Sequence, residues 1–288
     1  MAIETLLSRQ NQDGGWPYTR GSSWTEPTVY AILALLGAGE HDAAERGMRW
    51  IGAMVRPDGG WPPRGGVDES AWVTGLVALL PPERLGTGRY EAAIQWLLRT
   101  TGQESAFLYR MRELLLGNSE PPEQKFPGWP WVPGTAAWVG PTSIAMLALR
   151  RAAVRRASRA IGERLDDGRR FLIVRMCHEG GWNHGAVRPL GYETHPYPEM
   201  TGMALAALAG WKSPEVERAI TVARQFLADC RSADALNWLR LGLMAHGQLP
   251  PDYCAPTVTC RTTPETALGL LVGQKDNPLL GGLHGATV

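Results

Sequence analysis

Three short stretches of the chain decide its fold: Gln12–Pro17 (QDGGWP), Pro57–Pro62 (PDGGWP) and His178–Asn183 (HEGGWN). A weaker copy, Phe126–Trp131 (FPGWPW), lies between the second and third of them. Recurrence of one turn at intervals of roughly 45 to 70 residues is typical of a domain built from structural repeats. The paired glycines allow positive φ where a helix ends, and the tryptophan can bury its ring and donate its indole N–H to a helix-terminal carbonyl.

Two kinds of helix are predicted around these turns. A helix that is apolar on nearly all sides follows each turn, which marks it as buried; these segments are Glu26–Leu36, Ser70–Leu80, Pro141–Leu149 and Glu199–Ala209. Amphipathic helices with one charged face flank them, which marks them as exposed; these are His41–Arg56, Thr87–Thr100, Ser158–Met176 and Pro214–Cys230. A last pair, Asp234–Gly247 and Thr263–Gly273, has no such turn.

The pattern predicts an all-α fold of about six helical hairpins in two concentric layers, with the buried helices inside. An open solenoid is the alternative, but the terminal helices do not change to the polar composition of capping repeats. We expect one domain over residues 1–288, with an insertion at about 101–135. When the buried helices are aligned, Glu26 is level with Ser70, Gly140 and Glu199, and Thr28 is level with Trp72, Thr142 and Thr201.

Composition excludes several classes of function. Lys and Arg number 29 against 28 for Asp and Glu, so the chain has no overall charge that would attract nucleic acid. No apolar stretch approaches the roughly 20 residues of a membrane span, although one face can still touch a membrane peripherally. Four cysteines and no recognisable signal segment favour a reducing, cytoplasmic setting.

The turns resemble the QW motif of squalene and hopene cyclases, and the residues that match it are Gln10, Asp13, Gly14, Gly15 and Trp16. The alternation with Ala/Leu-rich helices also resembles protein prenyltransferase β subunits. This resemblance implies an α/α toroid that binds an isoprenoid in an apolar cavity along the ring axis. It also implies that the active-site groups lie near the amino ends of the inner helices.

The resemblance therefore implies particular site residues. The catalytic candidates are the acids Glu199, Glu26, Asp68 and Glu69, because a buried carboxyl can stay protonated and act as an acid. The candidates for substrate binding are Trp24, Trp72, Trp138, Tyr192, His195, Tyr197, Thr142 and Thr201. Aromatic faces among them can stabilise a cation. Each acid also has a structural explanation, as a first-turn residue that complements a helix dipole. Each aromatic residue is likewise explained as one that packs in a loop.

The chain departs from the family in its known initiating motifs. The Asp-x-Asp-Asp acid of squalene-type cyclases is not found, and Asp166 and Asp167 are interpreted as a solvated pair on an outer helix. The prenyltransferase branch binds zinc through Asp-x-Cys and a later His. Asp252, Cys254 and His284 are weak candidates for such a zinc site, since Pro256 prevents the helix that follows this pair in the family. No cofactor is therefore predicted with any certainty.

Two classes of function remain open. The first is an enzyme, a cyclase or transferase that acts on an isoprenoid or another apolar substrate. The second is a non-catalytic toroid that binds a lipid or a protein. A glycan-active ring enzyme is a third alternative, which the QW-like turns disfavour.

Overall fold

The computed structural model describes residues 2–105, 111, 115, 126–185, 194–250, 253–254, 256–274 and 277–280. This part of the chain is helical and contains no strand, so the all-α prediction is confirmed. The helices are α1 (Ala2–Arg9), α2 (Thr25–Gly37), α3 (His41–Ala53), α4 (Val73–Val77), α5 (Pro82–Leu85), α6 (Thr87–Arg99), η1 (Gln103–Ser105), α8 (Val139–Arg155), α9 (Arg159–Val174), α10 (Pro198–Ala207), α11 (Pro214–Asp229), α12 (Ala233–Ala245) and α13 (Thr263–Val272).

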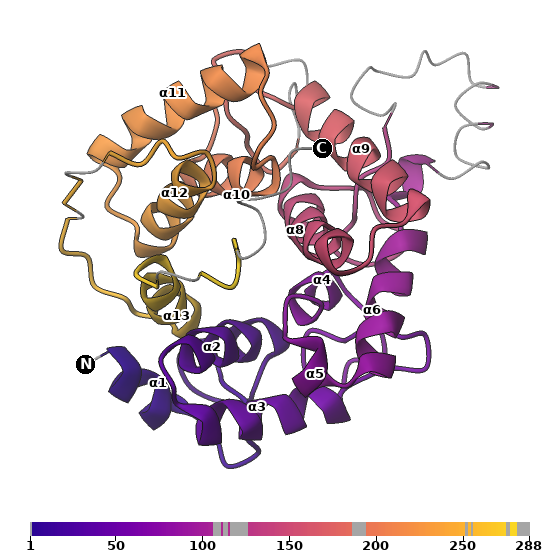
Figure 1. The fold of residues 1–288 in the computed structure, drawn as a ribbon, viewed down its shortest axis with the longest axis vertical. Coiled ribbons are helices and arrows are strands. Elements are labelled where there is room, and N and C mark those ends of the chain that lie inside the picture. The colour runs from indigo at the N-terminus through magenta and orange to yellow at the C-terminus, as the bar shows by residue number, and fades with distance from the viewer. Residues whose placement is uncertain are drawn as a thin grey trace.

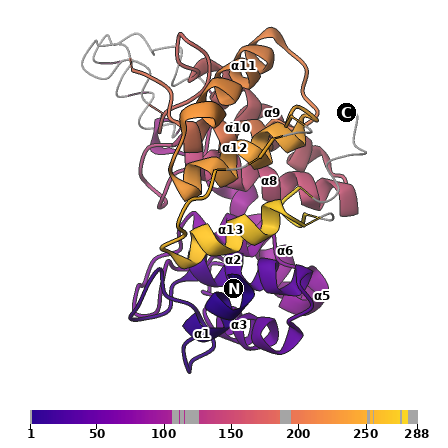
Figure 2. The ribbon, with the colours of Figure 1, turned by 90° about the vertical axis from the view of Figure 1, so that its left-hand side faces the viewer.

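Six helices form a closed inner ring. In order they are α2, α4, α8, α10, α12 and α13, and α13 packs against α2 to close the circle (Figure 1). Helices α1, α3, α5, α6, α9 and α11 lie outside them (Figure 1). Figure 2 shows the ring from its side, with α12 and α13 running roughly along its axis. The toroid of two concentric layers is therefore confirmed.

The last hairpin differs from the others. Both α12 and α13 belong to the inner ring, unlike the outer and inner helices of the other hairpins (Figure 1). The described residues that join them contain no helix. The inner position of both helices follows from their composition, because their apolar residues leave almost no solvated face: Leu236, Leu239, Leu241, Leu268 and Leu271 are all buried.

Each tryptophan of the repeated turns is the centre of a buried joint. Trp16, Trp61, Trp129 and Trp182 are at most 1% exposed. Each indole N–H donates to a carbonyl in the last turn of an outer helix: Leu6, Ile51, Leu97 and Leu172, at 2.7, 2.8, 2.9 and 2.6 Å. Burying about 200 Å² per ring stabilises the fold by ~5 kcal/mol each. The predicted role of the indole N–H is confirmed.

The backbone of each tryptophan is fixed as well, on the inner helix that follows. Its amide N–H donates to a fully buried threonine hydroxyl: Thr28, Thr74, Thr142 and Thr201, at 2.8, 2.9, 2.9 and 3.1 Å. Its carbonyl accepts the N–H of a residue just before the inner helix: Trp24, Ala71, Trp138 and Tyr197. Every joint thus ties an outer helix to an inner helix through three hydrogen bonds.

The acid and the glycines before the tryptophan shape the turn. Gly14 has φ 94°, and a Cβ there would lie 2.7 Å from the Arg46 carbonyl oxygen of α3. Asp13 accepts hydrogen bonds from the Gly15 amide, the Ser23 hydroxyl and the Trp50 indole. The second repeat copies these contacts with Asp58, Gly60, Ser70 and Trp96. Only glycine fits where the turn approaches the next outer helix this closely.

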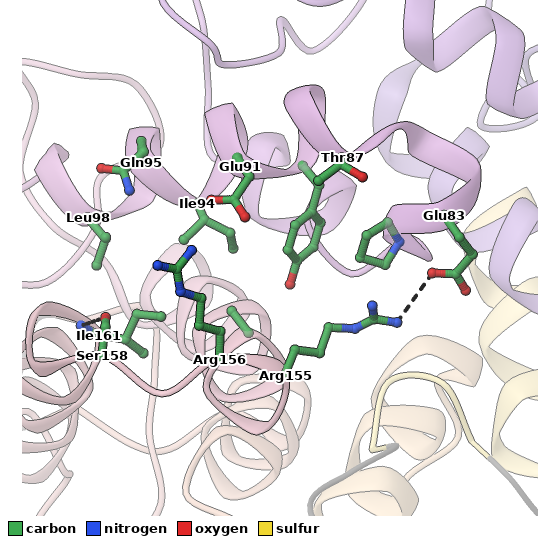
Figure 3. Close-up of a pocket in the computed structure, with 13 residues that line it drawn as sticks. Glu83, Thr87, Glu91, Ile94, Gln95, Leu98, Arg155, Arg156, Ser158 and Ile161 are labelled. Carbon is green, nitrogen blue, oxygen red and sulfur yellow. Dashed lines mark hydrogen bonds and ion pairs between the residues drawn. The ribbon is translucent and has the colours of Figure 1, made fainter.

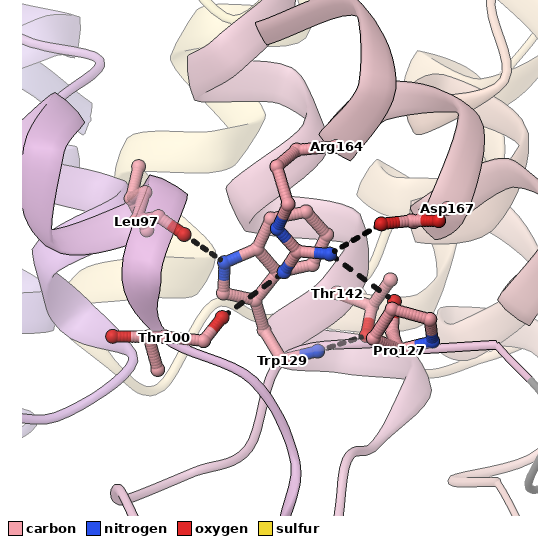
Figure 4. A network of polar contacts seen from close by, with 7 residues as sticks. All are labelled: Leu97, Thr100, Pro127, Trp129, Thr142, Arg164 and Asp167. Carbon is pink, nitrogen blue, oxygen red and sulfur yellow. Dashed lines mark hydrogen bonds and ion pairs between the residues drawn. The ribbon is translucent and has the colours of Figure 1, made fainter. Parts of the chain in front are cut away.

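The third joint has Pro127 in place of the first glycine and is built differently. Figure 4 shows the guanidinium of Arg164 over the Trp129 ring, 3.8 Å from its centre. Arg164 is 8% exposed, and it donates to the Thr100 carbonyl at 3.0 Å and contacts Asp167 at 3.3 Å. This arginine joins α6 to α9 across the tryptophan. Asp167 is thus paired with a buried arginine, whereas the sequence indicated a solvated pair.

Successive joints are also connected to one another. The amide at the start of an inner helix, or just before it, donates to the carbonyl two residues after the next tryptophan. These bonds run from Thr25 to Pro63, from Trp72 to Trp131, and from Val139 to His184. Thr263 of α13 makes the same bond back to Tyr18, at 2.7 Å. One repeated backbone contact therefore links the four joints in series and connects α13 to the first of them.

The second inner helix begins later than predicted. The sequence indicated a helix over Ser70–Leu80, but α4 covers only Val73–Val77. The joint shows the reason: Thr74, not Trp72, takes the place of Thr28, and Ser70 is held in the turn by Asp58. The predicted alignment of Trp72 with Thr28 is therefore wrong.

Among the described residues no helix is long and apolar enough to span a membrane.

Loss of one threonine hydroxyl tests the joint. Thr142→Val keeps the shape of the side chain but leaves the buried Trp129 amide N–H without its acceptor. We expect the free energy of unfolding in urea to fall by about 1–3 kcal/mol. Thr221→Val, at an exposed position of α11, is the control and should change it by less than about 0.5 kcal/mol. Equal free energies of unfolding for the two variants would contradict the role of the Thr142 hydroxyl in the joint.

Candidate functional site

All six inner helices begin at the same end of the ring. The tryptophan turns place the amino ends of α2, α4, α8 and α10 there, and the Thr263–Tyr18 bond brings α13 to the same end. Helix α12 runs parallel to α10, since Gly202 packs on Trp238 and Gly242 packs on Gly202 and Leu205. We call this end the ring mouth: the first turns of these six helices and the turns that precede them.

Four carboxyl groups meet on one side of the ring mouth. Glu26, Glu199 and Asp234 are each the second residue of their helices, α2, α10 and α12, and Glu265 is the third residue of α13. These helices are consecutive in the ring (Figure 1). All four side chains are partly buried. The ring thus gathers acids that lie far apart in the sequence.

Two of these acids hold their protons unusually tightly. Burial raises the pKa of Glu26 to about 7, although the Tyr18 hydroxyl, which donates to its Oε2, lowers it; the Asp234 charge raises it further. Burial raises the pKa of Asp234 to about 6, and the charges of Glu199 and Glu265 add to that increase. A first-turn carboxyl is stabilised in its charged form by the helix dipole, so burial and like charge outweigh the dipole here.

Asp234 was not among the predicted site residues. Helix α12 has no Gly-Gly-Trp turn before it. Its first turn could therefore not be aligned with the first turns of the other inner helices. The signal was nonetheless present: Ser232 caps α12 through the Ala235 amide, which makes Asp234 the second helical residue, level with Glu26 and Glu199.

The predicted aromatic residues lie along the ring mouth as pairs. Trp24 packs edge-on against Tyr18, with ring centres 5.6 Å apart, and Arg64 lies over its face. Trp72 packs against Trp131, and Tyr197 against His184, at 4.9 and 5.3 Å. Trp131 and Tyr197 are exposed, at 37% and 44%.

Trp138, the residue before α8, is partly buried. Tyr192, another predicted binding residue, lies outside the described residues.

The structure gives other contacts to three predicted binding residues. Thr142 and Thr201 are fully buried, and their hydroxyls hold the amides of Trp129 and Trp182. His195 is exposed and its Nδ1 lies 2.8 Å from a Glu179 carboxylate oxygen. These contacts account for the two threonines as parts of the joints.

The predicted acids Asp68 and Glu69 do not lie in a helix. They belong to the exposed loop before α4, and Asp68 forms a surface ion pair with Arg56 at 3.4 Å. Their expected place at the start of an inner helix is wrong, because that helix begins at Val73. Of the three zinc candidates, Cys254 is exposed, while Asp252 and His284 lie outside the described residues. Within the described ranges, no three His, Cys, Asp or Glu side chains converge as metal ligands would.

A separate hollow of about 470 Å³ lies at the opposite end of the inner helix α8. It is enclosed by α5, α6 and the junction of α8 and α9 (Figure 3). Its charges balance: Arg155 pairs with Glu83 at 3.3 Å, and Arg156 and Glu91 both line it (Figure 3). Because these charges cancel, we do not expect the hollow to select a charged ligand.

Comparison with known proteins places the fold. No family model matches the chain. It is 28% identical to drimenyl diphosphate synthase of Streptantibioticus cattleyicolor over 188 residues, which cover 63% of this chain but 32% of that protein. The chain thus spans about a third of the length of that curated relative.

Solved structures share the whole ring. The type II terpene cyclase MstE from Scytonema, in complex with geranylgeranyl dihydroxybenzoate, matches with a TM-score of 0.56 and 18% identity, over 96% of this chain and 78% of that one. The chain is terpenoid-cyclase-like in fold. A GH8 endo-β-1,4-glucanase from an Achatina fulica gut metagenomic library matches with a TM-score of 0.62 and 14% identity, over 95% and 97%. Both likenesses are of fold alone.

The raised pKa values predict how stability depends on pH. Since Glu26 and Asp234 bind protons more tightly in the folded chain than in the unfolded chain, the free energy of unfolding should fall as the pH rises from about 4 to 7. Glu26→Gln removes part of this fall. Relative to the unmodified chain, the variant should gain about 1–3 kcal/mol between pH 5 and pH 8, measured by urea unfolding.

Glu163→Gln, on the exposed face of α9, is the matched control and should keep the original pH profile. A Glu26→Gln variant with the original pH profile would show that Glu26 titrates normally.

Proposed function

We propose that the ring mouth is an acid site that protonates a carbon–carbon double bond of an isoprenoid, with Glu26 as the acid. The observation that carries this proposal is the partly buried position of Glu26 in the first turn of α2, in contact with the Tyr18 hydroxyl; burial there raises its pKa to about 7. A carboxyl with this pKa is substantially protonated at neutral pH, which general acid catalysis requires.

The chemistry balances within the ring mouth. The Glu26 O–H transfers its proton to one alkene carbon, which forms a C–H bond and leaves a carbocation on the other carbon and a carboxylate on Glu26. Attack by a second double bond of the same substrate forms a ring and moves the cation. Loss of a proton from a neighbouring carbon to a base then restores a double bond. Nothing is oxidised or reduced.

The neighbours of Glu26 each favour one state of this cycle. The charge of Asp234 helps to keep Glu26 protonated before the transfer. The Tyr18 hydroxyl donates to the Glu26 carboxylate and so stabilises the charge that the transfer leaves behind. Arg64 already lies over the face of Trp24, so Trp24 is proposed to contact the substrate rather than to stabilise its cation. Trp72, Trp138 and Tyr197 are proposed to contact the rest of the substrate.

Sequence and fold support an isoprenoid as the substrate class. The matched stretch of drimenyl diphosphate synthase and the fold of a terpene cyclase that binds a geranylgeranyl compound point the same way. The helices behind the first turns carry Ala, Leu, Val and Met side chains along α2, α8 and α10, a composition that suits an apolar substrate.

Hydrolysis of a β-linked glycan is the second candidate. Glycoside hydrolases use two neighbouring carboxyl groups with separate roles, and the charge of Asp234 raises the pKa of Glu26. Exposed aromatic faces such as Trp131 and Tyr197 suit the stacking of sugar rings. The contact of Glu26 with a tyrosine hydroxyl and the isoprenoid-cyclase relative favour the first candidate.

Product analysis tests the proposal. The purified chain is incubated with squalene or with geranylgeranyl diphosphate, and products are identified by mass spectrometry. We expect an isomer of the substrate with fewer double bonds and one more ring for each double bond lost. Glu26→Gln should lower the rate by about 100-fold or more, and Tyr18→Phe by about tenfold. The rate should fall above about pH 7, where Glu26 loses its proton.

Glu163→Gln, outside the ring mouth, should leave the rate unchanged. Saturable binding without any product would instead make the chain a non-catalytic lipid-binding ring, and cleavage of a soluble cello-oligosaccharide would favour the glycan candidate. Product formation that survives Glu26→Gln would remove Glu26 as the acid.

A further inference from the structure

A second hollow, between α1 and the turns that precede α2 and α13, is lined by arginine side chains. It measures about 580 Å³ and lies between the end of α1, the loop that leads to α2 and the residue before the α13 cap. Three of its lining residues are arginines: Arg9, Arg20 and Arg261. Ser8, Asn11, Pro17, Thr19 and Gly21 complete the lining, which contains no acidic side chain.

The first arginine is held in place by the ring itself. Arg9 donates through Nη2 to the Arg261 carbonyl at 3.0 Å and through Nη1 to the Thr266 hydroxyl at 3.4 Å. These bonds join the first helix to the last one. They fix the guanidinium at the wall of the hollow without neutralising its charge, because both acceptors are uncharged.

The side chains of the other two arginines form no ion pair among the described residues. These two, Arg20 and Arg261, are exposed. Two acids close in sequence to the lining have other partners: Glu265 accepts the amides of Arg261 and Thr262, and Asp13 accepts from Gly15, Ser23 and Trp50. Three positive charges therefore share one hollow with nothing negative in its lining.

The chemistry of this lining selects its ligand. Guanidinium groups bind phosphate oxygens through paired, charge-assisted hydrogen bonds. A carboxylate would balance one of the three charges, whereas a diphosphate or a dianionic phosphate ester balances most of them. We propose that this hollow, the Arg9/Arg20/Arg261 pocket, binds a phosphate-bearing anion.

The pocket is next to the ring mouth but does not depend on the function proposed for it. Pro17 and Thr19 line the pocket, and Tyr18 between them donates to Glu26. The ligand is either a free phosphate compound or the headgroup of an anionic lipid. Both present the same phosphate oxygens to the arginines, and the two arms of the test separate them.

Calorimetric titration with inorganic pyrophosphate at low salt is the first arm, and flotation with vesicles of phosphatidylcholine and phosphatidic acid is the second. Arg20→Ala, Arg261→Ala and their combination remove exposed side chains, so each variant should fold and melt like the original chain. Arg156→Ala is the matched control, since it removes one exposed charge at the far end of α8.

We expect saturable binding in at least one arm, weakened about tenfold by each single pocket substitution and abolished by the pair, while Arg156→Ala binds as before. Binding should also weaken as the ionic strength rises. Binding of pyrophosphate identifies a free phosphate compound as ligand, and binding of vesicles alone identifies a lipid headgroup. No saturable binding in either arm, or equal binding by the double variant, would overturn the proposal.

Because the readout is binding, a chain that turns over no isoprenoid still tests this site.

Discussion

Four buried tryptophans fix the geometry on which the rest of the molecule depends. Each one donates its indole N–H to the last turn of an outer helix and its amide to a threonine of the next inner helix. A tryptophan is large enough to span the two layers and carries donors at both ends of that span. Because the same three bonds recur, every inner helix that follows such a turn starts at the same end.

This shared starting point is what creates the candidate site. The turns place Glu26 and Glu199 at this end, while the packing of α12 on α10 and the Thr263–Tyr18 bond bring Asp234 and Glu265 to the same end. The helix dipoles favour the charged carboxylates by up to about 1 kcal/mol each. The rise in the pKa of Glu26 to about 7 corresponds to a cost on the order of 3 kcal/mol for its charge, so burial dominates.

The fold could be predicted from the sequence because each turn and each apolar helix is recognisable within a short contiguous stretch. The site could be predicted only in part. Glu26 and Glu199 follow recognisable turns, whereas Asp234 follows none, and Asp68 was misplaced because the loop after Trp61 is longer than the loop after Trp16. The hydrogen bonds of the joint threonines could not be predicted, since their partners are backbone amides 12 to 19 residues away.

Amide hydrogen exchange at the four joint tryptophans tests the central claim most directly. If the joints hold the ring together, the amides of Trp16, Trp61, Trp129 and Trp182 open only when the whole chain unfolds. Their exchange should then give one common free energy, equal to that of global unfolding. Exchange of any one of them through local opening, several kcal/mol below the global value, would contradict the claim.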